Sequence, residues 1–487
     1  MTSPASRRDL LEAAAAEVRA HDPAALKALG LLPRHDLFFP AIYYPPLTMY
    51  EGADGRDPLA GFEWTGRDRT CLYVHIPQCP SRCTYCHWMI SLSNSPADID
   101  LYLDHLEKEM DLWRSRLGGA APRPSSVLIG GGTPTLLSAA QLERLLTALA
   151  ARCDLSLCRQ FSVEAEPATL LGAAGLEKLR VMKDLGVDRI SMGVQALDDA
   201  VLKHMARPHD AAEAVAAIRQ IRRAGIASVS IDLIYGFPGS TPEKWAETME
   251  TALSLDIDAC QLYRLRIVPH GDKVGAVRES HRKSPDRFPP LEEVYLMKAL
   301  GKVAAERRGF AENLRRLFTR SPRHISYYLR DYGCRLYDNL GIGVSSWSSL
   351  GDRLLMNTGT NLKAYYAMIA AGRLPVDRVH VRTVDDERRR TLVLPLKGYG
   401  VSKTRYRERT GRGVGELFGP RIALLEKHGL LEQNEARLAL TPRGGFFADE
   451  VIMQFYAPRY LPFPREDYAA AELNPHRPAG TAATLRG

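Results

Sequence analysis

The sequence predicts an α/β fold in which a parallel sheet, curved into an incomplete barrel, is followed by a smaller C-terminal domain. Two observations lead to this fold. Short apolar strands alternate with helical stretches between residues 72 and 234, and strands that alternate with helices pair in parallel. After residue 375 the alternation gives way to glycine-punctuated strands and short helices. A chain of 487 residues exceeds one ordinary core, so we expect about two to four units.

The elements of the predicted barrel follow one another in a regular order. Strands are expected over residues 72–76, 127–129, 161–163, 187–192 and 228–234, because each is a short apolar run bounded by turn residues. Helices are expected over residues 139–152, 175–186 and 211–225. Several of these helices close with a glycine, which suits the C′ position. The first strand is broken by Pro77, where a loop begins.

Composition and charge narrow the class of protein. The chain has 65 Lys and Arg against 57 Asp and Glu, a net charge of +8, with 25% charged and 8% aromatic residues. These values are typical of a soluble globular protein and exclude wholesale disorder or a disulfide scaffold. The basic runs at residues 219–223, 315–323 and 405–412 are interpreted as solvated helix faces, so nucleic acid is not expected as a partner.

Membrane and secretion signals are not expected. No stretch approaches the roughly 18 apolar residues that a membrane span needs. Charged residues such as Arg7, Arg8 and Glu12 fall where a secretory signal would have its apolar segment. We therefore expect no membrane partner and a cytoplasmic, reducing location, in which clustered cysteines bind metal or catalyse rather than form disulfides.

Three of the eight cysteines are clustered in the loop after the first strand. Cys79, Cys83 and Cys86 have C-x3-C-x2-C spacing, so their thiolates can hold three corners of a [4Fe-4S] cluster. The fourth iron then has no protein ligand and stays open to bind a substrate directly. The alternative is a structural zinc site completed by His75 or His87, although zinc modules usually add a second pair of ligands downstream and none is evident.

Polar residues close successive strands of the predicted sheet. Glu164, Gln195, Arg207 and Asp232 lie at or after the carboxyl ends of strands, where ligands bind in parallel α/β barrels. Any one of them alone is more typical of a helix cap or a loop-stabilising group. Their coincidence at successive strand ends indicates a ligand site.

Motifs in a fixed order point to a known family. The cysteine loop is followed by GGGTPT at residues 130–135, SVEAEP at 162–167, RISMGVQ at 189–195 and IDLIYGFPG at 231–239. Together they resemble the radical S-adenosylmethionine (SAM) enzymes, and among these the oxygen-independent coproporphyrinogen III dehydrogenase family. The resemblance implies an incomplete parallel (β/α)6 radical SAM barrel in residues 67–290, its completion and a connecting region in 291–380, and a winged-helix-like α+β domain in 381–464.

The two ends of the chain differ from the rest. Residues 1–66 include an extended segment rich in aromatic residues and proline, which we expect to pack across the barrel opening. Residues 465–487 are rich in Ala, Pro and Gly, which predicts a disordered tail. We expect the chain to be a monomer.

The resemblance implies two SAM sites beside the cluster. In the family, a first SAM is held by residues that match Tyr73, Gly131 and Glu164. The residues that match the second SAM site are Tyr85, Gly132, Thr133, Gln195, Arg207 and Asp232. Four of these are also expected to take part in catalysis: Tyr85, Gln195, Arg207 and Asp232. Carboxylates suit the amine and hydroxyl groups of SAM, and an arginine fork suits its carboxylate.

Three positions depart from the family pattern. Trp88 stands where the coproporphyrinogen dehydrogenases have an extra cysteine, which weakens the namesake activity. Arg266 stands where the second SAM site has an alanine, which implies a rearranged pocket or a different acidic group to bind. Trp347 stands where a smaller apolar residue is expected; it borders the second SAM or the substrate, with a buried core tryptophan as the alternative.

One cluster with two SAM molecules resembles the class C radical SAM methylases and cyclopropanases of natural-product biosynthesis. This resemblance implies a C-methyltransferase. One SAM yields a 5′-deoxyadenosyl radical, the other a methylene radical that adds to an sp2 carbon of a small unsaturated or heteroaromatic substrate, giving a methyl or cyclopropane group. An electron donor such as flavodoxin or ferredoxin is implied as a partner. The alternatives are a porphyrin enzyme, either coproporphyrinogen dehydrogenase-like or heme-handling, and a non-catalytic heme chaperone.

Overall fold

The centre of the protein is a sheet of six parallel strands. The computed structural model describes residues 4–35, 37–65, 68–119, 121–268, 275–359 and 361–478. The six strands are neighbours in chain order: β2 (Thr70–Ile76), β3 (Pro124–Gly131), β4 (Phe161–Ala165), β5 (Arg189–Gln195), β6 (Ser228–Tyr235) and β7 (Ala259–Arg264). The predicted α/β fold class with a parallel sheet is therefore confirmed.

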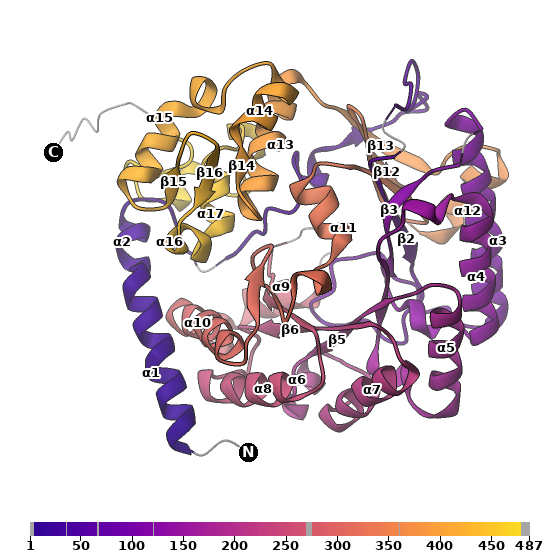
Figure 1. Ribbon diagram of the computed structural model, residues 1–487, viewed down its shortest axis with the longest axis horizontal. Helices are drawn as coiled ribbons and strands as arrows, with labels where there is room; N and C mark the ends of the chain where they lie inside the picture. The colour runs from indigo at the N-terminus through magenta and orange to yellow at the C-terminus, as the bar shows by residue number, and fades with distance from the viewer. Residues whose placement is uncertain are drawn as a thin grey trace.

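Helices connect these strands around the outside of the sheet, as Figure 1 shows. They are α3 (Pro96–Arg116), α4 (Ala139–Arg152), α5 (Gly172–Asp184), α6 (Asp199–His204), α7 (Ala211–Ala224) and α8 (Pro242–Ser254). Capping boxes start two of them, Ser138 with Gln141 at α4 and Asp210 with Glu213 at α7, and satisfy backbone N–H groups that the helix leaves free. Helix α7 ends at Gly225 in the left-handed conformation that its sequence predicts.

Short strands extend the sheet on both sides to thirteen strands. Next to β7 lies the antiparallel hairpin of β8 (Ala311–Asn313) and β9 (Leu317–Thr319). Next to β2 lies parallel β10 (Asp338–Ile342), followed by antiparallel β11 (Trp347–Leu350), β12 (Arg353–Asn357), β13 (Val376–Val381) and β1 (Glu51–Gly52). The helices of this region are α9 (Ala276–Lys283), α10 (Leu291–Arg307), α11 (Tyr327–Leu329) and α12 (Leu362–Ala370).

The C-terminal domain joins five helices with a small antiparallel sheet. Its helices are α13 (Val384–Lys397), α14 (Lys403–Thr410), α15 (Val414–Lys427), α16 (Pro442–Phe446) and α17 (Ala448–Met453). Its strands β14 (Val401–Ser402), β15 (Leu431–Gln433) and β16 (Arg437–Leu440) pair in the order β14-β16-β15. Figure 1 shows this domain, in orange and yellow, on the side of the molecule opposite α3, α4 and α5.

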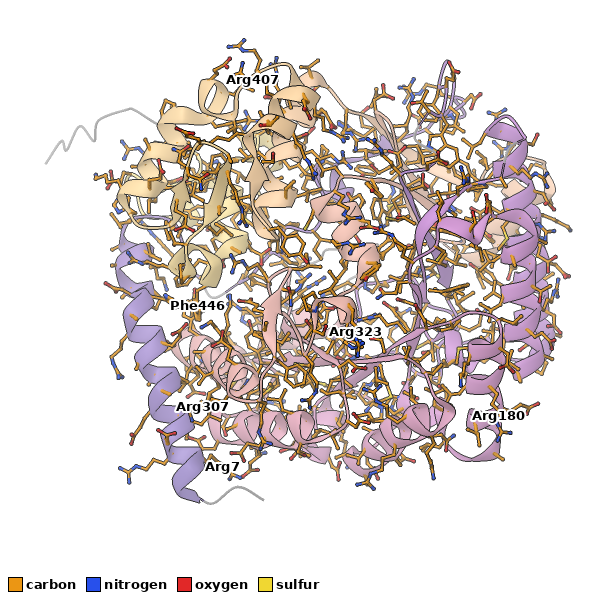
Figure 2. The ribbon with its side chains drawn as sticks, viewed as in Figure 1. Arg7, Arg180, Arg307, Arg323, Arg407 and Phe446 are labelled. Atoms are coloured by element: carbon orange, nitrogen blue, oxygen red, sulfur yellow. The ribbon has the colours of Figure 1, made fainter. Side chains whose placement is uncertain are left out.

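The N-terminal helices α1 (Pro4–His21) and α2 (Pro23–Ala28) run along the outer edge of the molecule, beside α10 and the C-terminal domain (Figure 1). Leu10 and Ala14 of α1 are buried. Ion pairs from Arg7 to Glu247 and from Lys302 to Glu17 hold its two ends. Figure 2 shows Arg7, Arg180 and Arg407 at the rim of the molecule.

The end of the chain differs from the tail that its composition predicts. Residues 465–478 are packed: Tyr468 forms a β-bridge with Pro33, and Leu473 is fully buried. These apolar side chains, absent from a simple Ala, Pro and Gly count, explain the packing. Residues 479–487 of the expected tail lie outside the described residues.

One hydrophobic core runs through the whole molecule. It includes Leu10 of α1, Val74 of β2, Leu392 of α13 and Leu473 near the end of the chain. The barrel and the C-terminal domain therefore stabilise each other. Among the helices that the structure describes, none combines the length and the apolar character needed to cross a bilayer.

Candidate functional site

A cavity of about 350 Å³ lies at the carboxyl ends of the parallel strands and collects the residues that the sequence singles out. Its lining includes all of them: Tyr73, Cys79, Cys83, Tyr85, Cys86, Gly131, Gly132, Thr133, Glu164, Gln195, Arg207, Asp232, Arg266 and Trp347. Residues separated by more than two hundred positions in the chain thus face one space. This is the place where parallel barrels bind ligands.

The three clustered cysteines are free thiols in the loop that follows β2. A hydrogen bond from Cys79 N to Ser91 O at 2.9 Å holds the loop to the segment that follows it, and one from Cys86 N to Cys83 O at 3.1 Å forms a turn within it. Burial raises the pKa of the Cys86 thiol to about 11. Three thiols on one cavity wall form a donor set suited to a [4Fe-4S] cluster with one open iron.

The zinc alternative does not fit this loop. The His75 ring contacts the Tyr73 hydroxyl at 3.0 Å and Met89 O at 3.1 Å, and the His87 ring contacts Arg266 O at 3.1 Å and accepts from Gly275 N at 3.3 Å. In the described part of the chain, no three His, Cys, Asp or Glu side chains are grouped to hold one metal ion. A cubane cluster does not require the three thiolates to converge on one metal ion, because each thiolate binds a different iron.

The glycine triplet after β3 allows close backbone approach to the cysteine loop. A Cβ at Gly132 would lie 2.6 Å from the carbonyl oxygens of Pro77 and Gln78, and Gly132 N donates to Ile76 O at 2.7 Å. The family resemblance places Gly131 and Gly132 beside SAM. In the structure, Gly132 also fixes the loop against the sheet, because a side chain there would displace it.

Two half-buried carboxyl groups that line the cavity stand on strands β4 and β6. Glu164 accepts a hydrogen bond from Gly131 N at 3.1 Å. Burial, and then the charge of Asp232, raises the pKa of Glu164 to about 7, and burial raises the pKa of Asp232 to about 6. A cationic ligand would stabilise the ionised form of each carboxyl group and so lower its pKa.

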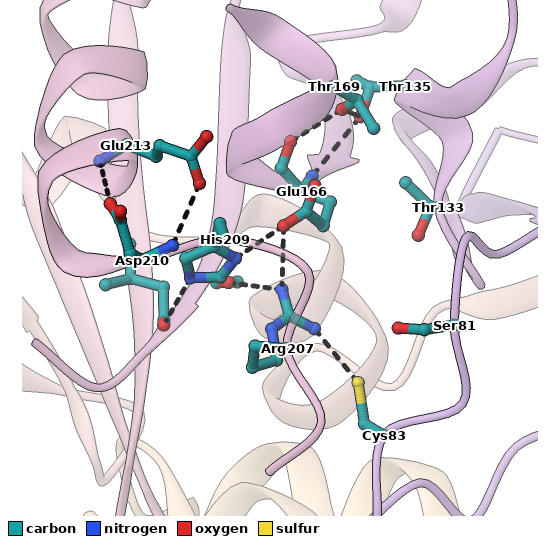
Figure 3. Close-up of polar contacts among 12 residues, drawn as sticks. Ser81, Cys83, Thr133, Thr135, Glu166, Thr169, Arg207, His209, Asp210 and Glu213 are labelled. Atoms are coloured by element: carbon teal, nitrogen blue, oxygen red, sulfur yellow. Dashed lines mark hydrogen bonds and ion pairs between the residues drawn. The ribbon is translucent and has the colours of Figure 1, made fainter. Parts of the chain in front are cut away.

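Arg207 joins the cysteine loop to the strand ends, as Figure 3 shows. Its guanidinium donates to Cys83 Sγ at 3.3 Å and to Gly193 O at 2.7 Å, and lies 3.7 Å from Glu166 Oε1. Glu166 Oε1 also lies 2.5 Å from His209 Nδ1. Arg207 is therefore held between a thiol, a carbonyl and a carboxylate.

Glu166 and His209 are functional candidates that the sequence reasoning missed. Both are buried, and Glu166 Oε2 has no hydrogen-bond partner among the described residues. Their positions carried a signal, because Glu166 lies two residues after Glu164 and His209 two residues after Arg207. In extended chain, residues two apart share a face.

Aromatic and cationic side chains form another part of the cavity wall. Trp347 is 5% exposed, and its ring packs between Tyr43 at 4.7 Å and Tyr332 at 4.6 Å between centroids. It is thus both a packed aromatic residue and part of the cavity lining. The guanidinium of Arg266 lies 5.8 Å from the centre of the Tyr263 ring.

The chain is similar to known proteins over most of its length. Residues 73–252 match the radical SAM superfamily and residues 383–447 match the HemN C-terminal domain. The heme chaperone HemW of Bacillus subtilis is 30% identical over 392 residues, covering 79% of this chain and 98% of that protein. The oxygen-independent coproporphyrinogen III oxidase of Salmonella typhimurium is 28% identical over 402 residues, covering 79% of this chain and 85% of that protein.

Two further proteins extend the comparison. The anaerobilin synthase of Escherichia coli O157:H7 is 26% identical over 384 residues, covering 78% of this chain and 82% of that protein. The solved structure of coproporphyrinogen III oxidase (HemN) from Escherichia coli, described as a radical SAM enzyme, has a TM-score of 0.73 at 25% identity. The structural match covers 85% of this chain and 96% of the solved chain.

These relatives correct the predicted activity. The class C methylase and cyclopropanase identification, with its methyltransferase reaction and natural-product setting, is wrong, because the proteins similar over most of the chain are named as heme chaperones and coproporphyrinogen oxidases. Trp88 suggested the methylases because it replaces a cysteine of one branch. That replacement separates the chain from the namesake dehydrogenase without selecting a methylase.

Proposed function

Because this chain belongs to the radical SAM superfamily, in the branch of the heme chaperone HemW and the oxygen-independent coproporphyrinogen III oxidases, we propose that it is a SAM-cleaving enzyme that acts on a tetrapyrrole. Members of this superfamily bind a [4Fe-4S] cluster and SAM. The observation that carries the proposal is the shared cavity, in which the cysteine loop and a wall of aromatic and arginine side chains face one space.

The cluster would be held by Cys79, Cys83 and Cys86, whose free thiols line that cavity. When bound, the cluster and SAM supply one-electron reductive cleavage and a radical that abstracts hydrogen. The carboxyl groups of Glu164 and Asp232 would pair with the amine or hydroxyl groups of SAM. The packed strand ends would keep water away from the reacting groups.

We propose that a single SAM lies beside the cluster. The cavity of about 350 Å³ is at the lower end of the roughly 300–1,000 Å³ usual for ligand sites. Tyr85, Gln195 and Arg207, which resemblance assigns to a second SAM, line this same space. Their polar groups are then available to orient the substrate. An external one-electron donor such as flavodoxin or ferredoxin, and a monomeric state, belong to the same proposal.

The substrate class follows from the wall chemistry together with the relatives. A tetrapyrrole has a broad apolar face and acidic side chains on its edge. The aromatic rings of Tyr43, Tyr263 and Trp347 offer surfaces for that face, and Arg264 and Arg266 offer partners for the carboxylates. The printed names of the relatives refer to heme and coproporphyrinogen.

A second candidate function is heme transfer without chemistry. It is favoured by Trp88, which removes the extra cysteine of the dehydrogenases, and by the alignment with HemW over 98% of that protein. The two functions are separated by the fate of the tetrapyrrole. The reconstituted protein is incubated anaerobically with SAM, a reductant, and either heme or coproporphyrinogen III, and the macrocycle is analysed by mass spectrometry. An altered mass supports the enzyme; an unchanged macrocycle without SAM cleavage contradicts it and supports the chaperone.

A further inference from the structure

A second cavity, of about 370 Å³, lies between the barrel and the C-terminal domain. Its walls come from β7, α10, the β8–β9 hairpin, and α16 with α17. Figure 2 shows Phe446 at this junction, between the C-terminal domain and helices α1 and α10. Arg264 and Arg316 line both this cavity and the cavity of the cysteine loop. The two spaces therefore meet at these arginines.

The turn that carries Arg316 has an unusual backbone. Leu314, Arg315 and Arg316 have φ angles of 54°, 49° and 65°, in the left-handed region that side chains disfavour. The turn is held by hydrogen bonds from Arg316 N to Glu312 Oε1 and from Leu262 N to Arg316 O, both 2.9 Å. Three consecutive strained residues without glycine are retained only where the surroundings enforce them. The result is that Arg316 is presented at the junction of the two cavities.

Arg266 and Arg316 share one aromatic partner. The guanidinium of Arg266 lies 5.8 Å from the centre of the Tyr263 ring, and that of Arg316 lies 5.0 Å from it. Arg266 lies two residues after the end of β7, and β9, which begins directly after Arg316, pairs with β7. Sheet pairing thus brings the two like charges together. Burial, and then the charge of Arg316, lowers the pKa of Arg266 to about 10.

Three carboxyl groups lie near these guanidiniums. Asp232 shares their cavity and is influenced by the charge of Arg316, although no ion pair joins the two. The other two carboxylates are held by other partners. Asp449 forms an ion pair with Lys397 and accepts from Ala41 N at 2.8 Å. Glu312 pairs with Arg315 at 3.8 Å in addition to its bond to the Arg316 backbone. Within the described residues, no carboxylate forms an ion pair with Arg266 or Arg316. Two adjacent guanidinium groups without an anion between them are an arrangement that a bound anionic group would stabilise.

We infer that Arg266 and Arg316 form a clamp for one carboxylate of the substrate, at the passage between the two cavities. This inference rests on the proposed function and names how a tetrapyrrole is oriented there. Two guanidinium forks bind a carboxylate with paired hydrogen bonds and neutralise its charge. The macrocycle then extends from the cysteine-loop cavity toward the second cavity, because SAM occupies much of the first.

The second cavity has groups suited to the rest of such a substrate. Lys298 lies 4.7 Å from the centre of the Phe446 ring, and its ammonium also contacts Phe446 O. The guanidinium of Arg264 lies 5.0 Å from the Phe38 ring and 5.9 Å from the Tyr295 ring. Cations stacked on aromatic rings offer both charge and flat apolar surface. An acidic, planar ligand matches both features.

The test compares acidic macrocycles with their esters. The full-length, reconstituted chain is titrated with hemin and with coproporphyrin III. Each acid is compared with its methyl ester, which keeps the ring and removes the negative charge of the carboxylates. The unaltered chain should bind an acid about tenfold or more tightly than its ester. Arg266→Gln and Arg316→Gly should each remove about that factor and leave affinity for the esters and for SAM unchanged.

Arg316→Gly guards against misfolding, because glycine accepts the positive φ at this position. Arg320→Gln is the matched control. Arg320 lies at the opposite end of β9 from Arg316, and its guanidinium stacks on Phe310, 4.5 Å from the ring centre. Equal weakening of acid and ester by the clamp variants would assign them a structural role only. Weakened SAM binding would show that the guanidiniums hold SAM's own carboxylate, and no effect at all would also overturn the clamp. If the unaltered chain binds neither acid nor ester, the proposed function itself fails.

Discussion

The two half-buried carboxyl groups of the cavity, Glu164 and Asp232, change its charge near neutral pH. The pKa of Glu164 is raised to about 7 and that of Asp232 to about 6, chiefly by burial. A ligand with an ammonium or sulfonium group needs these carboxylates ionised. At a pH below the raised value, part of the binding free energy is spent on removing a proton.

We expect SAM affinity to increase by about tenfold from pH 6 to pH 8, because Glu164 ionises over that range. Calorimetric titration of the reconstituted protein measures this. Glu164→Gln should bind SAM more weakly and with a flatter pH profile. Glu177→Gln is the control, because Glu177 is exposed on α5. A profile that keeps its full slope in Glu164→Gln would show that another group is responsible.

A third carboxyl group, Glu109 of α3, is fully buried and has a structural role. It accepts hydrogen bonds from Trp113 Nε1 at 3.1 Å, Asn357 Nδ2 at 2.7 Å, Gly343 N at 2.8 Å and the Tyr365 hydroxyl at 2.6 Å. Burial nevertheless raises its pKa to about 7. A raised pKa means that the folded state binds the proton more tightly than the unfolded chain does. This contribution to stability is therefore full below about pH 4.5 and is lost as pH rises through about 7.

Glu109→Gln should lower the free energy of unfolding by about 2 kcal/mol, because the amide N–H group would face donors that need an acceptor. Chemical denaturation at several pH values measures this. The variant should also lose the part of the pH dependence that lies between about pH 4.5 and 7. Glu107→Gln, two residues earlier on a different and partly exposed face of α3, is a fair control for the loss of a charge. Equal stability of Glu109→Gln and the unaltered protein would refute the assigned role.

At the scale of elements, the segment from α6 to α7 docks on the cysteine loop. Thr84 N donates to Met205 O at 3.1 Å, and the Ser81 hydroxyl donates to Ala206 O at 3.2 Å. Arg207 adds its bond to Cys83, and Glu166 and His209 hold Arg207 from behind (Figure 3). Glu166 and His209 are therefore positioning residues, which act through Arg207.

We predict that Glu166→Gln or His209→Ala slows SAM cleavage about tenfold while cluster content stays the same, because Arg207 loses part of its support. Iron analysis and 5′-deoxyadenosine formation measure the two quantities. The change that SAM causes in the electron paramagnetic resonance spectrum of the reduced cluster should also become weaker. His204→Ala, an exposed neighbour on α6, should leave all three unchanged. Loss of iron from the variants would instead indicate a structural role.

Local patterns predicted the elements of the barrel well. The helices expected over residues 139–152 and 211–225 match α4 (Ala139–Arg152) and α7 (Ala211–Ala224), because capping boxes and a terminal glycine define their ends locally. The short strands β10–β13 and β1 were not predicted. Their pairing depends on partners far apart in the chain, such as Glu51 with Val379, which no local pattern records.

Site residues could be predicted from the sequence where each lies at the carboxyl end of a strand that the local pattern identifies. Glu164, Gln195 and Asp232 fall in this group, and all line the cavity. Contacts between distant segments were not predictable, and the pairing of Glu166 with His209, 43 positions away, is an example. The same limit applies to Arg316, whose role depends on a turn that only the folded hairpin forms.

At the scale of the whole molecule, the largest hydrophobic core links the N-terminal helix, the barrel and the C-terminal domain. Leu10 of α1 is 4% exposed and belongs to that core, whereas Arg8 forms only an exposed ion pair with Glu12. The N-terminal helix is therefore expected to unfold together with the rest of the chain.

We expect one cooperative unfolding transition by calorimetry, with Leu10→Ala lowering stability by about 2–3 kcal/mol because it leaves a cavity in the shared core. Arg8→Ala should have almost no effect, since exposed ion pairs contribute little. Two separate transitions, with only one of them sensitive to Leu10→Ala, would show that the N-terminal helix and the C-terminal domain are independent of the barrel.

The central claim is that the cysteine loop and the cavity act together in tetrapyrrole-dependent cleavage of SAM. The most direct measurement is the amount of 5′-deoxyadenosine that the reduced, reconstituted protein forms anaerobically from SAM, with and without heme or coproporphyrinogen III. We predict that one of these tetrapyrroles stimulates formation, that Cys83→Ala abolishes it, and that Cys158→Ala, outside the cavity lining, does not. Formation that persists in Cys83→Ala, or that neither tetrapyrrole changes, would contradict the claim.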